Sequence, residues 1–368
     1  MDIIKINDTS NKLYFIGGIV RDFLLNRECL DVDITYVGNA IDYCARFGKV
    51  LQVNPDFGTI KVLVDGREVD FASTRTEKYE KKGHLPQVDK LGVSLKEDVL
   101  RRDFTVNALA MSVSTGEIVN YTGGVEDLHN GILRVLHDGS FIDDPTRIIR
   151  GLKFAMRFGF ELDEHTKKLQ DDYLANINYD MSYSRVKKEL TETFGCKGQM
   201  EHGLQWAYER FINDDIYKIV TPQKVNLPAV NIEKLVNDYP VEYSWLVFAG
   251  TLGDLSRLPL TKIEQKILDD LPSKDLTTDF EIYKAFENLR METVLLYGIL
   301  HNEKTARHYL DDLQQIKLTL TGADLKNLGF APSPAYSKCF DYILAEKLKN
   351  PDLTKHEELQ IAKRFFQN

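Results

Sequence analysis

Short apolar runs alternate with helical stretches over the N-terminal part of the chain. Runs with apolar side chains at every second position predict strands, and they lie at residues 12–16, 30–36, 58–64, 67–72, 109–113 and 117–121. Asp65-Gly66 is a dipeptide that favours tight hairpin turns, and a second hairpin is predicted around Thr115-Gly116. Residues 19–26 have helical spacing. The pattern therefore predicts a small mixed sheet with helices behind it.

From Asp144 onward the apolar residues recur at helical spacing. Asp144 followed by Pro145 indicates a helix start, because aspartate caps a first turn and proline fits the first helical position. Further helices are predicted at residues 163–176, 182–195, 199–211, 229–236, 241–254, 260–270, 278–300, 304–314 and 334–349. The expected fold class is therefore α+β, with the sheet first and an all-helical remainder after it.

Composition narrows the class of protein. The 368 residues are 43% apolar and 28% charged, which is enough for two or three domains with a substantial core. No apolar run reaches the roughly 20 residues of a membrane helix, and the start lacks the layout of a signal peptide. The 4 cysteines form no C-x-x-C pair, so we expect a reducing cytoplasm. A net charge of −9 allows only a focused RNA-binding patch.

A glycine pair precedes the first predicted helix. Gly17 and Gly18 can present backbone N–H groups to a phosphate, and Arg21 on the first turn adds positive charge. A structural turn is the alternative for such a pair taken alone. Because carboxylates follow on the next strand, we favour a phosphate site.

Asp31 and Asp33 leave the same face of that strand. Carboxylates about 7 Å apart repel each other unless a cation lies between them, and Mg²⁺ accepts carboxylate and phosphate oxygens together. Asp70 is a third carboxylate, in the apolar strand at 67–72. A solvated edge and a paired core aspartate are the alternatives. The three acids favour two-metal phosphoryl transfer, with Asp70 orienting the attacking hydroxyl.

Two later blocks can hold the rest of a nucleotide. Arg102 can clamp a phosphate and Asn107 a ribose hydroxyl, on one or two helical turns that also carry Asp103; an exposed, salt-bridged helix end is the alternative. Asp144 can accept from an exocyclic amine while Arg147 donates to a ring nitrogen. Cytosine and adenine both present that edge, whereas uracil and guanine present the reverse. The alternative is a helix cap with its partner three residues later.

The helix that begins after Pro145 also carries positive charge at regular spacing. Its basic residues recur three and four positions apart, which predicts a cationic stripe suited to phosphates, at Arg150, Lys153 and Arg157.

Together these blocks resemble the class II tRNA nucleotidyltransferase and bacterial poly(A) polymerase family, within the polymerase β superfamily. The resemblance covers roughly residues 12–195, in segments 15–22, 30–34, 69–76, 101–110, 133–160 and 184–190. Residues 320–329 resemble the distal helical region of the family. The resemblance implies a polymerase β-like nucleotidyltransferase head with a small mixed sheet, followed by an all-α neck, body and tail.

The resemblance also implies an activity, namely CCA addition to tRNA 3′ ends from CTP and ATP with Mg²⁺. The implied roles are metal binding by Asp31 and Asp33, a third carboxylate at Asp70, sugar and triphosphate binding by Arg102, Asp103 and Asn107, base reading by Asp144 and Arg147, and phosphate contact by Arg150. We expect Arg185 and Glu189 to form an internal ion pair. Residues 78–88 resemble the loop that the family needs for the final A, which counts against a CC-only enzyme.

The predicted domains are a catalytic head at 1–140, a base-recognising neck at 141–200, a body at 201–315 and a tRNA-binding tail at 316–368. The expected partners are the acceptor and T-arm of tRNA, CTP and ATP, with no membrane; the oligomeric state stays open.

Several other functions remain open at this point. An enzyme that adds only A or only CC, or a poly(A) polymerase, shares the same chemistry. A catalytically silent RNA-binding protein is the alternative from another class. The three acids count against it, because unused carboxylates at a phosphate site repel RNA.

Overall fold

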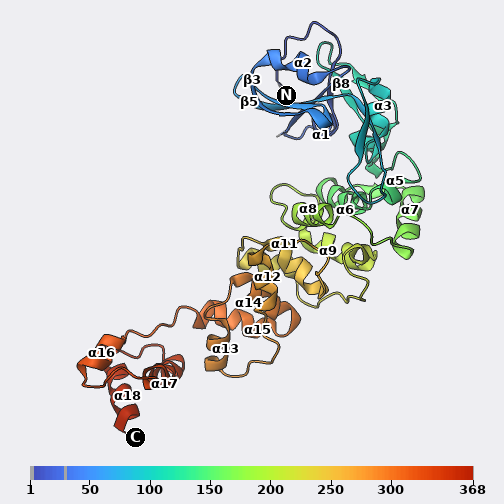
Figure 1. The fold of residues 1–368 in the computed structure, drawn as a ribbon. Helices are drawn as coiled ribbons and strands as arrows, with labels where there is room; N and C mark the ends of the chain where they lie inside the picture. The colour runs from blue at the N-terminus through green and yellow to red at the C-terminus, as the bar shows by residue number, and fades with distance from the viewer. Residues whose placement is uncertain (1–3, 29–30, 368) are drawn as a thin grey trace. The chain divides into compact units, whose positions relative to one another are not determined.

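The chain divides into two compact units, which are described separately. The computed structural model describes residues 4–28 and 31–367 (Figure 1). The first unit comprises Met1–Val225 with Ser256–Pro259, and the second comprises Asn226–Leu255 with Leu260–Asn368. In the described ranges no helix has both the length and the apolar character needed to cross a bilayer.

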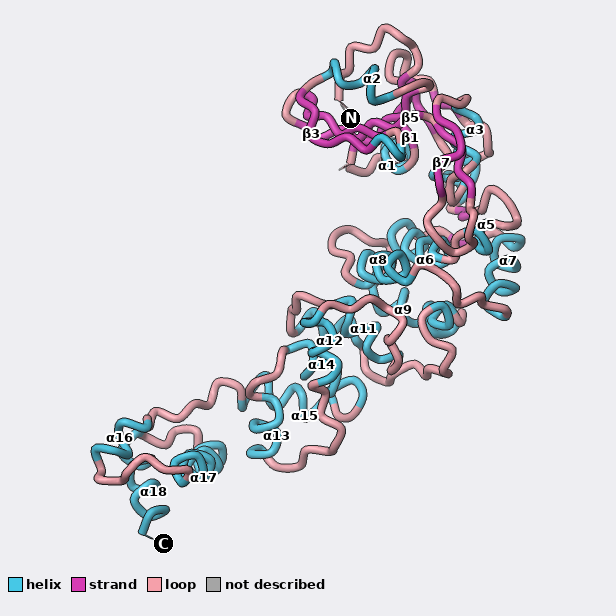
Figure 2. Tube along the Cα trace, in the orientation of Figure 1, coloured by secondary structure: helices cyan, strands magenta, loops and turns pink. Residues whose placement is uncertain are grey.

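The first unit contains the sheet. Its strand order is β3-β4-β5-β2-β1-β8-β9, with bounds Leu13–Ile16 (β1), Val32–Tyr36 (β2), Lys49–Asn54 (β3), Thr59–Val64 (β4), Arg67–Ser73 (β5), Ala110–Ser112 (β8) and Ile118–Val119 (β9). β2 and β5 run parallel, whereas the other described neighbours are antiparallel. Strands and helices are distinguished by colour in Figure 2. The predicted mixed sheet and the α+β class are therefore confirmed.

The strands follow the sequence pattern where one face is buried. In β2 the side chains of Val32 and Ile34 are buried while that of Asp33 leaves the opposite face. Asp65 and Gly66 have φ angles of 48° and 81°, as a tight hairpin turn requires. Leu30, at the start of the predicted strand, lies outside the described residues.

A second, two-stranded sheet flanks the segment expected to be a loop. β6 (Arg75–Lys78) pairs with β7 (Gln87–Leu91), so residues 79–86 form the tip of a hairpin. α3 (Leu95–Leu100) follows, and Ser94 caps it together with Glu97. The predicted helical turns over 101–107 are wrong, because α3 ends at Leu100 and only a short 3-10 turn forms at Thr105–Asn107.

Helices complete the first unit. They are α1 Gly18–Leu24, α2 Ala40–Cys44, α4 Gly124–Asn130, α5 Ser140–Asp143, α6 Thr146–Phe158, α7 Glu164–Ala175, α8 Tyr183–Phe194 and α9 Leu204–Asn213. α6 is buried along most of its length and packs against α8 and α9. Asp144 Oδ1 accepts from the Thr146 N–H at 3.2 Å, but the N-cap of α6 is Pro145, one position later than predicted. α6 therefore carries Arg147 on its first turn and follows directly after Asp144 and Pro145.

The second unit is helical in its described residues. Its helices are α10 Ile232–Asp238, α11 Ser244–Ala249, α12 Lys262–Asp269, α13 Asp279–Phe286, α14 Met291–Leu300, α15 Glu303–His308, α16 Gly322–Asn327, α17 Ala335–Lys349 and α18 Lys355–Gln367. The single helix predicted over 278–300 is wrong, because α13 and α14 are separate. The apolar spacing continues across the break since Leu289 packs on the same core as Phe286 and Val294.

Candidate active site

A cavity of about 640 Å³ in the first unit brings most of the predicted site residues together. The predicted residues that line it are Gly18, Arg21, Asp31, Asp33, Arg102, Asp103, Asn107, Asp144, Arg147 and Arg150. Gly17, Asp70 and Lys153 do not line it. Segments far apart in the sequence thus contribute to one hollow of the size that small-molecule ligands occupy.

The three predicted carboxylates lie in or just before two neighbouring strands of the sheet. Asp33 on β2 is in register with Asp70 on the parallel strand β5, and Asp70 is in register with Lys61 on β4. The Lys61 ammonium lies 3.3 Å from Asp70 Oδ2. Asp31 is exposed just before β2 begins. Two acids therefore face the cavity, and the third is paired with a lysine beside them.

The surroundings of Asp33 favour a bound cation. Burial raises the pKa of Asp33; the nearby Arg102 opposes that rise, and the negative charges of Asp70 and Asp31 add to it. Within the described residues, no group of three or more His, Cys, Asp and Glu side chains is arranged to hold a metal ion. Asp31 and Asp33 alone match the one or two carboxylates with which proteins hold Mg²⁺ beside substrate phosphates.

The backbone N–H of Gly17 does not point to a phosphate site, contrary to the prediction. Its backbone N–H donates to the Leu109 carbonyl at 3.0 Å, so this N–H is not available to a phosphate as expected. Its φ is +77°, and Arg102 Nη1 lies 2.6 Å from the position that a Cβ would take. Glycine is favoured here because a side chain would strain this positive φ and would displace the Arg102 guanidinium.

Arg102 is a cation with an unused donor. Its Nε atom is buried and has no hydrogen-bond partner among the described residues. Its Nη2 lies 3.7 Å from Asp98 Oδ2. A buried donor without a partner is rare in native proteins and calls for a ligand or water.

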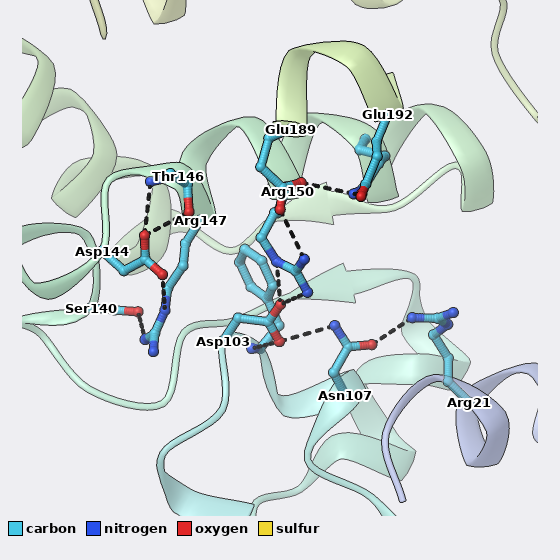
Figure 3. Close-up of polar contacts among 12 residues, drawn as sticks. Arg21, Asp103, Asn107, Ser140, Asp144, Thr146, Arg147, Arg150, Glu189 and Glu192 are labelled. Carbon is cyan, nitrogen blue, oxygen red and sulfur yellow. Dashed lines mark hydrogen bonds and ion pairs between the residues drawn. The ribbon is translucent and has the colours of Figure 1, made fainter. Parts of the chain in front are cut away.

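A chain of polar contacts runs from α1 towards α8 (Figure 3). Arg21 Nη1 donates to Asn107 Oδ1 at 2.6 Å, and Asn107 Nδ2 donates to Asp103 Oδ1 at 3.0 Å. Arg150 donates to Asp103 Oδ2 through Nε and Nη2, at 2.9 and 2.8 Å. Burial would raise the pKa of Asp103, but the Arg150 charge and the Asn107 hydrogen bond outweigh it and lower that pKa.

The predicted cationic stripe on α6 is largely neutralised. Arg150 Nη1 donates to Glu189 Oε1 at 3.1 Å, and Lys153 Nζ donates to Glu189 and Glu192 at 2.8 and 2.5 Å. The predicted Arg185–Glu189 ion pair is wrong, because Glu189 takes these partners from α6 and Arg185 pairs with Asp144. Arg150 therefore forms part of the cavity wall, and Lys153 lies behind that wall and holds Glu189 in place.

Asp144 and Arg147 lie side by side in the lining of the cavity. Asp144 Oδ1 accepts from the N–H and hydroxyl of Thr146, and Oδ2 accepts from Arg185 Nη2. Arg147 donates to Ser140 Oγ at 2.7 Å through Nη1 and to the Arg101 carbonyl at 3.1 Å through Nη2. Both residues are nearly fully buried.

These contacts leave one donor and one acceptor site open next to each other. A carboxylate offers about four acceptor sites, and three at Asp144 are used, so one remains on Oδ2. Arg147 Nε donates to none of the described residues within hydrogen-bond distance and lies 4.0 Å from Asp144 Oδ2. An acceptor beside a donor matches the amine and ring nitrogen shared by cytosine and adenine.

Some lining residues were missed from the sequence. Tyr79, Leu85 and Pro86 reach the cavity from the tip of the β6–β7 hairpin, and Arg185 reaches it from α8. The Tyr79 hydroxyl accepts from Arg147 Nη2 at 3.4 Å. An aromatic residue and a proline within a polar loop were the available signals, but neither indicates which distant residue it contacts.

Comparisons with known proteins agree on a family. Residues 13–134 match the family described as the poly A polymerase head domain. A CCA-adding enzyme of Lactobacillus helveticus is 33% identical over 390 residues, which cover 94% of this chain and 92% of that enzyme. An A-adding tRNA nucleotidyltransferase of Geobacter sulfurreducens is 29% identical over 413 residues, which cover 99% of this chain and 46% of that enzyme. The chain thus spans about half the length of the Geobacter relative.

A solved structure shares the fold. The Thermotoga maritima CCA-adding enzyme, complexed with tRNA(CCA), superposes with a TM-score of 0.76 at 24% identity. The match covers 96% of this chain and 91% of that one.

Proposed function

The chain belongs to the tRNA nucleotidyltransferase family that contains the CCA-adding enzymes, and on that premise we propose that it adds CCA to tRNA 3′ ends from CTP and ATP. The observation that carries the proposal is the single cavity that joins two acids, Asp31 and Asp33, to the open donor and acceptor of Arg147 and Asp144. The acids serve phosphoryl transfer, and the polar pair serves selection of the base without a template.

Protein side chains position the nucleotide. Arg102, whose side chain is half-buried and lines the cavity, binds the triphosphate beside Gly17 and Gly18. Asp103 and Asn107, fixed by Arg150 and Arg21, line the cavity where the sugar lies. This fixed arrangement supplies the preorganisation on which phosphoryl transfer depends.

Asp31 and Asp33 fit a divalent cation, and we assign Mg²⁺ to them. That cation supplies charge stabilisation to the attacking and leaving oxygens of the displacement. Asp70 lies beside Asp33 in the sheet and, held by Lys61, is placed to orient the 3′-hydroxyl of the incoming tRNA.

The same proposal assigns a role to each of the four predicted domains. Residues 1–140 catalyse, 141–200 read the base, 201–315 form the body and 316–368 bind tRNA. Cys44, Cys196 and Cys339 are free thiols, which is consistent with a cytoplasmic location.

An A-adding enzyme is the second candidate, because the Geobacter relative is named as one. The two are separated by incubating the purified chain with tRNAs that lack CCA, CA or only the terminal A, each with CTP, ATP or both. CCA addition predicts extension of all three tRNAs to full length. Extension of only the tRNA that lacks the terminal A reassigns the chain as A-adding, and long A tails reassign it as a poly(A) polymerase.

The same assay tests the metal and the non-enzyme alternative. Chelation with EDTA should stop extension, and Mg²⁺ added in excess should restore it. Binding of tRNA without extension of any substrate in the presence of Mg²⁺ would reassign the chain as an RNA-binding protein.

A further inference from the structure

We infer that Arg185 on α8 is a positioning residue for base selection, which orients the Asp144 carboxylate so that one acceptor site faces the base. The inference rests on the proposed function, because it assigns a role within base selection by Asp144 and Arg147. From the sequence, Arg185 was expected only to form an ion pair with Glu189 in the same helix.

The hydrogen bonds at Asp144 define what is left for a ligand. Thr146 uses Oδ1 through its N–H and its hydroxyl, at 3.2 and 2.6 Å. Arg185 Nη2 donates to Oδ2. Since a carboxylate has about four acceptor sites, the open site lies on Oδ2, and the direction of the Arg185 bond decides where that site points.

Arg147 does not perform this task. Its guanidinium is turned towards Ser140 and the Arg101 carbonyl, and its Nε lies 4.0 Å from Asp144 Oδ2. This distance is too long for a hydrogen bond. Arg185 therefore holds the Asp144 carboxylate through a hydrogen bond, whereas Arg147 forms only a longer ion pair with it.

Arg185 is itself held at several points. Its Nη1 donates to the His84 carbonyl in the hairpin tip at 3.3 Å. Its helix is anchored by Val186 and Leu190, which are fully buried. The Arg185 side chain is 26% exposed and lines the cavity. A guanidinium fixed in this way can transmit one orientation to Asp144.

Loss of Arg185 should relax selection. Without the bond, Oδ2 has two open acceptor sites and the carboxylate is free to tilt, so the remaining acceptor no longer faces the base in one fixed direction. The exocyclic amine of cytosine or adenine then loses its preferred partner, and the advantage of these bases over uracil and guanine should fall.

The test compares Arg185→Met, Arg185→Lys and Arg210→Met with the native chain. Arg210 on α9 is a matched control, because it is 29% exposed and forms ion pairs with Glu161 and Asp214. The kcat/KM for CTP and for UTP is measured on a tRNA that lacks CCA, and thermal unfolding is recorded for each protein. Arg185→Gln, which keeps an N–H donor without the charge, replaces the Met variant if that variant does not fold.

We expect Arg185→Met to lower the CTP-to-UTP ratio by roughly 10- to 100-fold, the range of a charge-assisted hydrogen bond. The ratio should stay within about threefold of native in Arg185→Lys and Arg210→Met, because each keeps a cation at Asp144. The inference is overturned if the CTP-to-UTP ratio of Arg185→Met equals that of the native chain. It is also overturned if the ratio falls as far in Arg185→Lys or Arg210→Met as in Arg185→Met. If the native chain extends no tRNA, the proposed function itself fails, and this outcome is distinct from the others.

Discussion

Asp33 and Asp70 lie side by side in register on β2 and β5, two adjacent parallel strands of the sheet. Adjacent strands lie about 4.8 Å apart, so the two carboxylates belong to one local charge cluster, which Asp31 extends at the start of β2. Burial, together with the charges of Asp70 and Asp31, raises the pKa of Asp33 against the opposing effect of Arg102. The cluster is therefore unfavourable for the fold by itself and favourable for a bound cation.

Replacement of Asp33 should separate activity from stability. We expect Asp33→Ala to lower nucleotide incorporation by at least about 10³-fold, as for other groups that act in the transition state. The melting temperature at neutral pH should be unchanged or higher, since a carboxylate with a raised pKa costs the fold free energy when it is charged. Incorporation assays and thermal unfolding check both points, with the exposed Asp56→Ala as control. Native activity in Asp33→Ala would contradict the metal role.

Replacement of Asp144 should affect the choice of nucleotide. Asp144→Ala removes the open acceptor site next to Arg147 Nε, so the preference for CTP over UTP should fall by about 10- to 100-fold. Competition assays with mixed nucleotides on a tRNA lacking CCA measure this preference. Asp171→Ala, on the exposed face of α7, serves as the control. Unchanged rejection of UTP and GTP would remove Asp144 from base reading.

A methyl group at position 17 should disturb Arg102. Gly17→Ala places a Cβ 2.6 Å from Arg102 Nη1 and also strains a backbone with φ of +77°. Gly66→Ala is the matched control, because its φ is +81° but a Cβ there meets no atom within 4 Å. Both variants should lose about 1–2 kcal/mol of stability from the backbone. Only Gly17→Ala should raise the KM for nucleotide, by roughly tenfold or more, and equal KM values in the two variants would refute the role of Gly17.

His308 should make stability depend on pH. Hydrogen bonds to Asp312 and Asp279, at 2.8 and 3.0 Å, raise the pKa of His308 above its ordinary value of 6.5. The stabilisation is complete below the unfolded pKa and is lost as the pH rises through the folded one. The melting temperature of the native chain should therefore exceed that of His308→Gln by more at about pH 6 than at about pH 9. A constant gap between the native chain and His308→Gln at the two pH values would contradict the prediction.

The sequence pattern predicted the strands that have one buried and one more exposed face. It did not predict the strands in which both faces are similarly exposed. β2, β4 and β5 alternate between buried and less buried residues, and a turn dipeptide joins the last two. β3 was missed because its side chains are exposed along almost its whole length. The β6–β7 hairpin was missed because its strands are mostly polar. Apolar spacing reports burial, and these elements bury little.

The candidate site shows the same limit. The acids, the arginines and Asn107 could be proposed from residue type and spacing within short blocks. The bond from Arg185 to Asp144 joins residues 41 positions apart, and the contact between Tyr79 and Arg147 joins residues 68 apart. No local pattern encodes such contacts, because packing of α8 and of the hairpin against α6 decides them. For the same reason the sequence did not indicate that carboxylates from α8 neutralise Arg150 and Lys153.

The polar chain between α1 and α8 ties the sheet to the helices that follow it. The polar chain consists of six hydrogen-bonded side chains, in the order Arg21, Asn107, Asp103, Arg150, Glu189 and Lys153. These side chains are largely buried, and each donor is bonded to an acceptor. Detachment of α6 from the sheet would leave Asp103 without the partner that keeps it charged, at a cost that neither segment can recover alone. The sheet and the helices that follow it should consequently unfold in a single cooperative step. Catalysis and base selection should therefore be lost together on heating.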